Sequence, residues 1–124
     1  MPRIILFADD DESIRKSHKF FFEMNFPEYD VEFFRDGTSL NKRLNQDLTG
    51  VCAVVTDNKM PGIEGSGIIK DYARRLRHIP FILSYGGDKE IGEEAVRAGA
   101  YAYVLKTDNP RLYEVLKRVL NRQN

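Results

Sequence analysis

The sequence has few cysteines and no excess of charge of either sign. Among its 124 residues there is one cysteine, Cys52, so no disulfide can form within the chain. Lys+Arg and Asp+Glu each number 19, which gives no electrostatic reason to expect nucleic acid or an anionic membrane as a partner. No apolar run suits a transmembrane helix, and no basic-then-apolar leader opens the chain. We therefore expect a cytoplasmic protein.

The chain reads as one domain over residues 1–124, since no repeat, linker or low-complexity segment divides it. A chain of this length buries roughly two-thirds of its unfolded surface, enough to fold without a metal or a disulfide. Short apolar runs and segments with helical spacing alternate five times. The runs predict strands over residues 4–8, 30–34, 51–56, 80–84 and 101–106; the spacing predicts helices over 11–25, 36–48, 65–77 and 89–98, and from 109 onward.

Because most of these strands are solidly apolar, they indicate a parallel sheet with helices on both faces. Residues 30–34 instead alternate, which is typical of an edge strand. One apolar stripe of Leu40, Leu44 and Leu48 predicts a helix that includes all three. At the start of the last helix Asn109 precedes a proline, so we expect it to be the N-cap.

Polar side chains follow four of the five predicted strands. Asp9 and Asp10 come after the first, Asp57 ends the third, Ser84 the fourth and Lys106 the fifth. In a parallel sheet the carboxyl ends of the strands meet at one edge, where working groups gather. We therefore expect these five residues to lie together.

Three carboxylates brought close together repel one another unless a cation joins them. An all-oxygen site with room for water suits Mg²⁺ better than a caged Ca²⁺. Beside such an ion, Asp57 could attack a phosphoryl group and form an acyl phosphate, with Lys106 neutralising charge and Ser84 donating to a phosphoryl oxygen. Each residue alone also has a structural explanation, as a helix cap or a turn residue. The prediction depends on the whole set.

Four segments resemble the receiver domains of response regulators in two-component signalling, over essentially the whole chain. The pattern D-x-x-M-P-G-x-x-G is highly specific, with an acidic pair upstream and a lysine downstream. The segments are ILFADDDESIR, VVTDNKMPGIEG, IPFILS and AGAYAYVLK. The resemblance implies a flavodoxin-like, doubly wound α/β fold: a five-stranded parallel sheet in the order 2-1-3-4-5, with five helices on both faces.

The resemblance also implies what this site does. Asp57 would take a phosphoryl group from a phosphohistidine on a histidine kinase or a histidine phosphotransfer protein. Asp10 would bind Mg²⁺ directly, with Asp57 and the main-chain carbonyl of Lys59, and Asp9 would assist through water. The domain would not be an enzyme beyond Mg²⁺-dependent self-phosphorylation and slow self-dephosphorylation.

The resemblance further assigns a switch. Ser84 would be the switch hydroxyl, Lys106 the phosphate contact and Tyr103 the switch aromatic. A new phosphoryl group would draw Ser84 and Lys106 toward it. The space that Ser84 leaves would let Tyr103 turn inward, and the surface of the fourth helix, fifth strand and fifth helix would change for a downstream protein partner.

Three departures from the family pattern matter. Thr107 follows Lys106 where the family usually has proline, so we expect a trans bond or a strained loop, because a non-proline cis bond costs about 2.5–4 kcal/mol. Lys59 could shield the acyl phosphate from water and prolong its life, or be a solvated loop cation. The fifth strand lacks the acidic pair of relatives that dimerise there, so we expect a monomer or a weak dimer. His18 is expected at the surface or boundary.

Three other functions share some of these sequence features. A haloacid-dehalogenase-type phosphatase would use Asp9 as nucleophile and Asp11 as acid/base, but it needs acidic metal ligands late in the chain, where Ser84 and Lys106 stand. A flavodoxin-like cofactor binder would need a first loop without three adjacent acids. A receiver that only docks, without phosphorylation, stays open. The kinase, the target, the signal, and whether the receiver stands alone or belongs to a longer protein are open as well.

Overall fold

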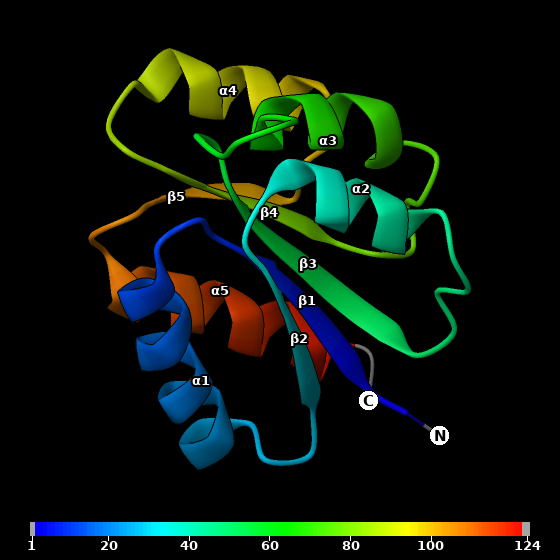
Figure 1. The fold of residues 1–124 in the computed structure, drawn as a ribbon, viewed down its shortest axis with the longest axis vertical. Helices are drawn as coiled ribbons and strands as arrows, with labels where there is room; N and C mark the ends of the chain where they lie inside the picture. Colours follow the sequence, from blue (N-terminus) through cyan, green and yellow to red (C-terminus); the bar gives the residue numbers. More distant parts are fainter. Residues whose placement is uncertain (1, 123–124) are drawn as a thin grey trace.

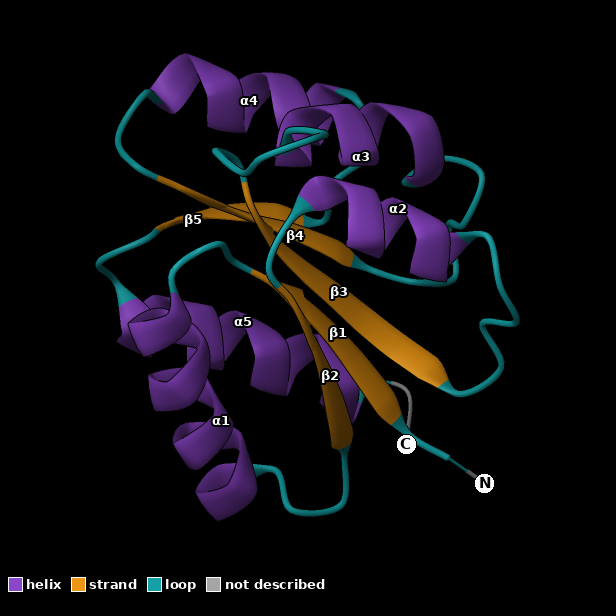
Figure 2. Ribbon diagram, viewed as in Figure 1, coloured by secondary structure: helices purple, strands orange, loops and turns teal. Residues whose placement is uncertain are grey.

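The computed structural model describes residues 2–122, and its strands form one five-stranded parallel sheet in the order β2-β1-β3-β4-β5 (Figures 1 and 2). Helices connect consecutive strands throughout. The elements are β1 Ile4–Ala8, α1 Glu12–Asn25, β2 Asp30–Phe34, α2 Gly37–Leu44, β3 Val51–Asp57, α3 Gly65–Tyr72, β4 Phe81–Tyr85, α4 Lys89–Arg97, β5 Ala102–Leu105 and α5 Asn109–Asn121. The predicted doubly wound fold and strand order are confirmed.

The sheet is the middle of three layers. Helices α1 and α5 cover one face, and α2, α3 and α4 cover the other (Figure 1). Alternate residues of β1 belong to different cores: Ile5 and Phe7 pack toward α1 and α5, whereas Leu6 and Ala8 pack with α2, α3 and α4. Both faces of the central strands are therefore buried, which explains why they read as unbroken apolar runs.

Strand β2 lies at the edge of the sheet, as its alternation predicted. Two helices are shorter than predicted. Helix α2 ends at Leu44, where the C-cap residue Asn45 donates to the Tyr72 hydroxyl, so Leu48 lies in the following loop while still packing on the core. Helix α3 ends at Tyr72, and residues 73–78 form turns.

The cap of α5 also differs from the prediction. The side chain of Asp108 accepts a hydrogen bond from the Arg111 amide at 3.1 Å, so Asp108 is the N-cap and Asn109 begins the helix. Both residues are good caps, and the side chain that reaches the free amide decides between them. In the part of the chain that the structure describes, no helix has the length and apolar character needed to cross a bilayer.

Candidate functional site

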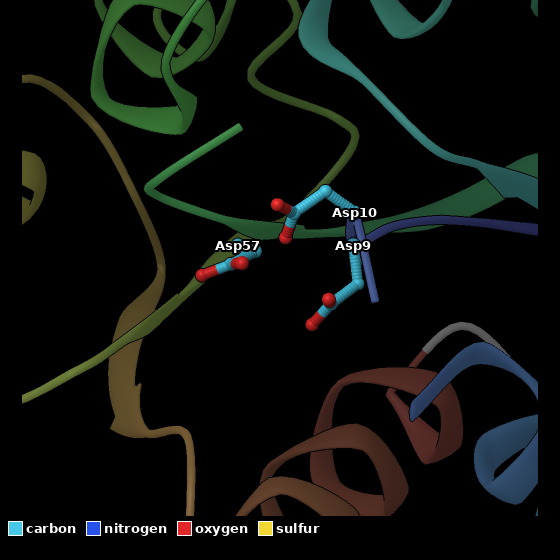
Figure 3. A group of neighbouring side chains, drawn as sticks. All are labelled: Asp9, Asp10 and Asp57. Carbon is cyan, nitrogen blue, oxygen red and sulfur yellow. The ribbon is translucent and has the colours of Figure 1, made fainter. Parts of the chain in front are cut away.

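Three carboxyl groups meet where β1 and β3 end. Because Ala8 pairs with Thr56, the residues that follow them are neighbours: Asp9 lies just after β1 and Asp57 is the last residue of β3. Asp10 joins them, and one oxygen from each of the three lies within 4.8 Å of the others (Figure 3). Asp9 and Asp57 are only 2% and 4% exposed, while Asp10 faces solvent. The convergence predicted from the strand ends is present.

Lys106, just beyond β5, supplies the positive charge of the cluster. Its Nζ lies 2.8 Å from Asp57 Oδ2 and 3.3 Å from Asp9 Oδ2. Burial raises the pKa of the Asp57 carboxyl, opposed by the hydrogen bond from Lys106. Burial alone would lower the pKa of Lys106, but its hydrogen bond to Asp57 and the charges of Asp57 and Asp9 outweigh burial and leave that pKa above its ordinary value. The lysine is therefore charged and held between two carboxylates.

The loop after Lys106 begins with Thr107, where receiver-like sequences usually have a proline. No peptide bond is cis and no residue other than glycine has a positive φ within residues 2–122, so the bond to Thr107 is trans and its loop lacks that kind of strain. The Lys106 amide donates to the Tyr85 carbonyl at 2.8 Å, and the Asp108 amide donates to the Leu105 carbonyl at 2.9 Å. These main-chain bonds hold Lys106 in place.

Backbone contacts also fix the turn after Asp57. The Asn58 amide donates to the Ser84 carbonyl at 3.1 Å, and the Asn58 carbonyl accepts from the Gly65 amide at 2.9 Å. A Cβ on Gly65 would lie 2.2 Å from the Asp57 carbonyl oxygen, so only glycine allows this approach. This steric restriction explains why the second glycine of the D-x-x-M-P-G-x-x-G pattern is needed at position 65.

Sequence reasoning missed two residues that position the acids. The buried side chain of Asn58 accepts from the Ser66 amide at 3.0 Å, which ties the turn to α3. Arg15 of α1 donates to the Asp9 carbonyl at 2.8 Å. A polar residue directly after an apolar strand was a signal for Asn58. Nothing local indicated Arg15, which is six residues from its partner.

The remaining predicted residues surround the cluster at different distances. Ser84 pairs with Asp57 in the register of β3 and β4, so it is adjacent. Exposed Lys59 lines a cavity of about 370 Å³ together with Asp10, Asp57, Lys106 and the Gly86–Asp88 loop. Tyr103 does not line this cavity; its ring contacts Tyr85, with centroids 5.4 Å apart.

The charges of the cluster suit a divalent cation. Three carboxylates carry three negative charges, and Lys106 offsets one of them. All the candidate ligand atoms are oxygens, and the cavity beside them has room for water, which is the combination that Mg²⁺ prefers. The residues therefore fit a magnesium ion.

A doubly wound parallel sheet with an acidic cluster and a lysine at its carboxyl edge defines the receiver class of signalling domain. The sequence model of the response regulator receiver domain matches residues 5–117, and the chain belongs to this family. Receiver domains act in two-component signalling, where they interact with histidine kinases and bind Mg²⁺ at an acidic pocket. They are signalling domains rather than classical enzymes.

Two curated relatives are both named C4-dicarboxylate transport transcriptional regulatory protein DctD. The protein from Rhizobium meliloti (strain 1021) is 29% identical over 106 residues, which cover 85% of this chain and 22% of that protein. The protein from Pseudomonas aeruginosa is 30% identical over 103 residues, covering 82% and 21%. The chain thus spans about a fifth of the length of these relatives.

Solved structures agree with the family and the fold. A CheY-like receiver domain protein from Methanospirillum hungatei JF-1 is 31% identical with a TM-score of 0.82, covering 99% of this chain and 97% of that one. A receiver domain protein from Clostridium thermocellum is 25% identical with a TM-score of 0.86, covering 98% and 96%.

Proposed function

We propose that Asp57 is the phosphoacceptor of this receiver domain and that its donor is a phosphohistidine on a histidine kinase or a histidine phosphotransfer protein. A carboxylate oxygen of Asp57 attacks phosphorus, the P–N bond to the donor imidazole breaks, and the imidazole leaves with the electron pair and takes up a proton. The observation that carries the proposal is the Asp57 carboxylate, almost buried yet lining an open cavity, with Lys106 at 2.8 Å.

The other site residues prepare this transfer. Asp10, Asp57 and the main-chain carbonyl of Lys59 would hold Mg²⁺, with Asp9 assisting through water. When bound, the ion supplies positive charge that offsets repulsion between the carboxylates and the incoming phosphoryl oxygens. Lys106, already paired with Asp57, is placed to exchange that contact for one with a phosphoryl oxygen. The same arrangement supports self-phosphorylation from a small phosphodonor, followed by slow hydrolysis.

The output would be a change in the surface formed by α4, β5 and α5. Ser84 lies beside Asp57 in the sheet, so a phosphoryl group on Asp57 is within reach of its hydroxyl after a small movement. Tyr103, one strand further, would respond as the switch aromatic. We propose that a downstream protein, not nucleic acid or a membrane, binds this surface, and that the chain acts in the cytoplasm as a monomer or weak dimer and as one receiver domain over residues 1–124.

Lys59 would lengthen the life of the phosphoform. Its side chain is exposed at the mouth of the cavity that the phosphoryl group enters, where it can obstruct the approach of water. An unchanged hydrolysis rate in Lys59→Ala would leave it as a solvated loop cation.

Intact-mass spectrometry after incubation with acetyl phosphate and Mg²⁺ tests the phosphoacceptor. One phosphoryl adduct is expected on the wild-type chain, none without Mg²⁺ and none on Asp57→Asn. The matched control is Asp71→Asn, which changes an exposed aspartate of α3 and should keep the adduct. An adduct that survives Asp57→Asn would instead favour Asp9 as nucleophile and phosphatase-type chemistry. No adduct on a folded wild-type chain would favour a receiver that only docks.

A further inference from the structure

The ring of Tyr103 rests directly on the backbone of α4 at Gly92. A Cβ placed on Gly92 would lie 2.3 Å from Cδ2 of Tyr103 and 2.6 Å from Cγ, far inside any real contact distance. Gly92 is buried in the middle of the helix, and Tyr85 meets the same ring with an interplanar angle of 72°. The missing side chain of Gly92 thus leaves a slot, and the Tyr103 ring fills it.

No small adjustment of the Tyr103 ring would make room for a side chain at position 92. The atoms that a Cβ would strike are at the base of the ring, next to the Tyr103 Cβ, so turning the ring about its axis does not remove Cγ from the clash. The whole side chain would have to leave its χ1 well or α4 would have to move away from β5. Glycine is also the least favourable helix-interior residue after proline, so its presence here needs a reason such as this close approach.

We propose that Gly92 is a positioning residue that holds the Tyr103 ring between α4 and β5 and thereby sets the shape of the α4–β5 surface. Two apolar side chains of this surface, Val96 on α4 and Leu105 on β5, are each 43% exposed. Their relative placement depends on how closely α4 approaches β5, and the ring in the slot determines that distance. A side chain at position 92 would separate the two elements or expel the ring.

A second step links the slot to the phosphoryl site, and this step alone rests on the function proposed above. Tyr85, which contacts the ring, is the neighbour of Ser84 in β4 and lines the cavity beside Asp57. Movement of Ser84 toward a phosphoryl group would shift Tyr85 and the wall of the slot. The Tyr103 ring would then leave the slot in the phosphorylated state.

A double-mutant cycle on urea unfolding tests the slot. Gly92→Ala should lower the unfolding midpoint, whereas in the Tyr103→Ala background the same change should raise it, because the clash is gone and alanine favours the helix. Gly67→Ala in α3 is the matched control: its new Cβ would meet only the Ile63 Cγ2 at 3.4 Å, and the midpoint should not fall. If Gly92→Ala has the same effect in both backgrounds, the slot is refuted.

Fluorine NMR on 3-fluorotyrosine-labelled protein reports the surroundings of the Tyr103 ring directly. A loss of stability without movement of the ring would not change this signal. The Tyr103 signal, assigned as the one missing in Tyr103→Phe, should shift in Gly92→Ala and stay in place in Gly67→Ala. No shift in Gly92→Ala would overturn the positioning role.

The same spectra test the link to phosphorylation. With acetyl phosphate and Mg²⁺, the wild-type Tyr103 signal should shift, and it should shift less in Gly92→Ala, where the added Cβ has already displaced the ring or moved α4 away from it. A wild-type chain that gains the phosphoryl mass without any change in the Tyr103 signal would refute the link and leave the slot intact. A chain that gains no phosphoryl mass would refute the proposed function instead, while the unfolding cycle still decides on the slot.

Discussion

The two faces of the sheet are held by different kinds of contact. On the face covered by α1 and α5, aromatic rings lie against one another: Phe21 stacks on Tyr113 with centroids 3.3 Å apart, and Phe7 meets His18 at 4.6 Å. A hydrogen bond of 2.6 Å joins the Tyr113 hydroxyl to Nδ1 of the buried His18. This bond connects the first helix to the last.

The protonation states of this pair follow from their burial. Burial raises the pKa of the Tyr113 hydroxyl to about 12, so the hydroxyl keeps its proton. Burial lowers the pKa of His18, opposed by the charge of Asp9, so the imidazole is neutral. The hydrogen bond between the Tyr113 hydroxyl and Nδ1 of His18 therefore joins two uncharged partners.

The opposite face is more open where α4 begins. A Cβ on Gly86 or Gly87 would meet nothing within 4 Å, and half-buried Ile91 borders the cavity beside Asp57. Between α4 and β5, the ring of Tyr103 lies directly against Gly92. The acidic cluster therefore borders an open loop on the α4 side of the sheet. A phosphoryl group at this position would displace the Gly86–Asp88 loop more readily than the packed elements, because nothing lies within 4 Å of where side chains on its two glycines would be.

Truncating a core ring on the α1–α5 face should have the largest effect. Phe22 is 2% exposed, and Phe22→Ala is expected to lower the free energy of unfolding by about 3–5 kcal/mol. The control is Ile91→Ala on α4, expected to cost only about 1 kcal/mol, because burying a whole isoleucine contributes about 1.5–3 kcal/mol and this one is half-buried. Urea unfolding followed by circular dichroism gives both values. Equal losses would contradict the difference in burial between these two positions.

Removing the hydroxyl that joins α5 to α1 should have a smaller effect. Tyr113→Phe keeps the ring stacked on Phe21 but leaves Nδ1 of His18 buried without its hydrogen-bond partner. The expected loss is about 1–3 kcal/mol of unfolding free energy. Amide hydrogen exchange should increase in α1 and α5 and stay unchanged in α4. Faster exchange confined to α4 would show that the pair does not join these two helices.

The smallest effect should come from the pH dependence of stability. Just below pH 6.5, only a fraction of the unfolded chains binds a proton at His18 that the folded protein does not bind. Burial holds the pKa of His18 below its ordinary value of 6.5, so in this range the unfolded chain binds more protons than the folded one. Stability is therefore full above pH 6.5 and falls as the pH decreases toward the lowered pKa. His18→Gln should flatten this slope, measured by urea unfolding between pH 7.5 and 5. His78→Gln, which changes an exposed histidine, should retain it.

Much of the fold and of the site followed from local patterns. Unbroken apolar runs predicted central parallel strands. The polar residues at their ends predicted that five side chains would lie together, as they do: Asp9, Asp10, Asp57, Ser84 and Lys106. The prediction for His18 was wrong, since it is 5% exposed. It lies four residues after Ile14, on the inward stripe of α1, but its partner Tyr113 is 95 residues away and no local pattern indicates such a pair.

By itself, the sequence determined which segments become strands and which side chains stand at their carboxyl ends, because side-chain periodicity and strand termini are properties of neighbouring residues. The tertiary structure alone decided three other features. These are the end of α2 at Leu44, the burial of His18 beside Tyr113, and the packing of the Tyr103 ring against Gly92. Each of these depends on how closely two elements distant in the chain approach each other, and that distance is set by the packing of whole layers.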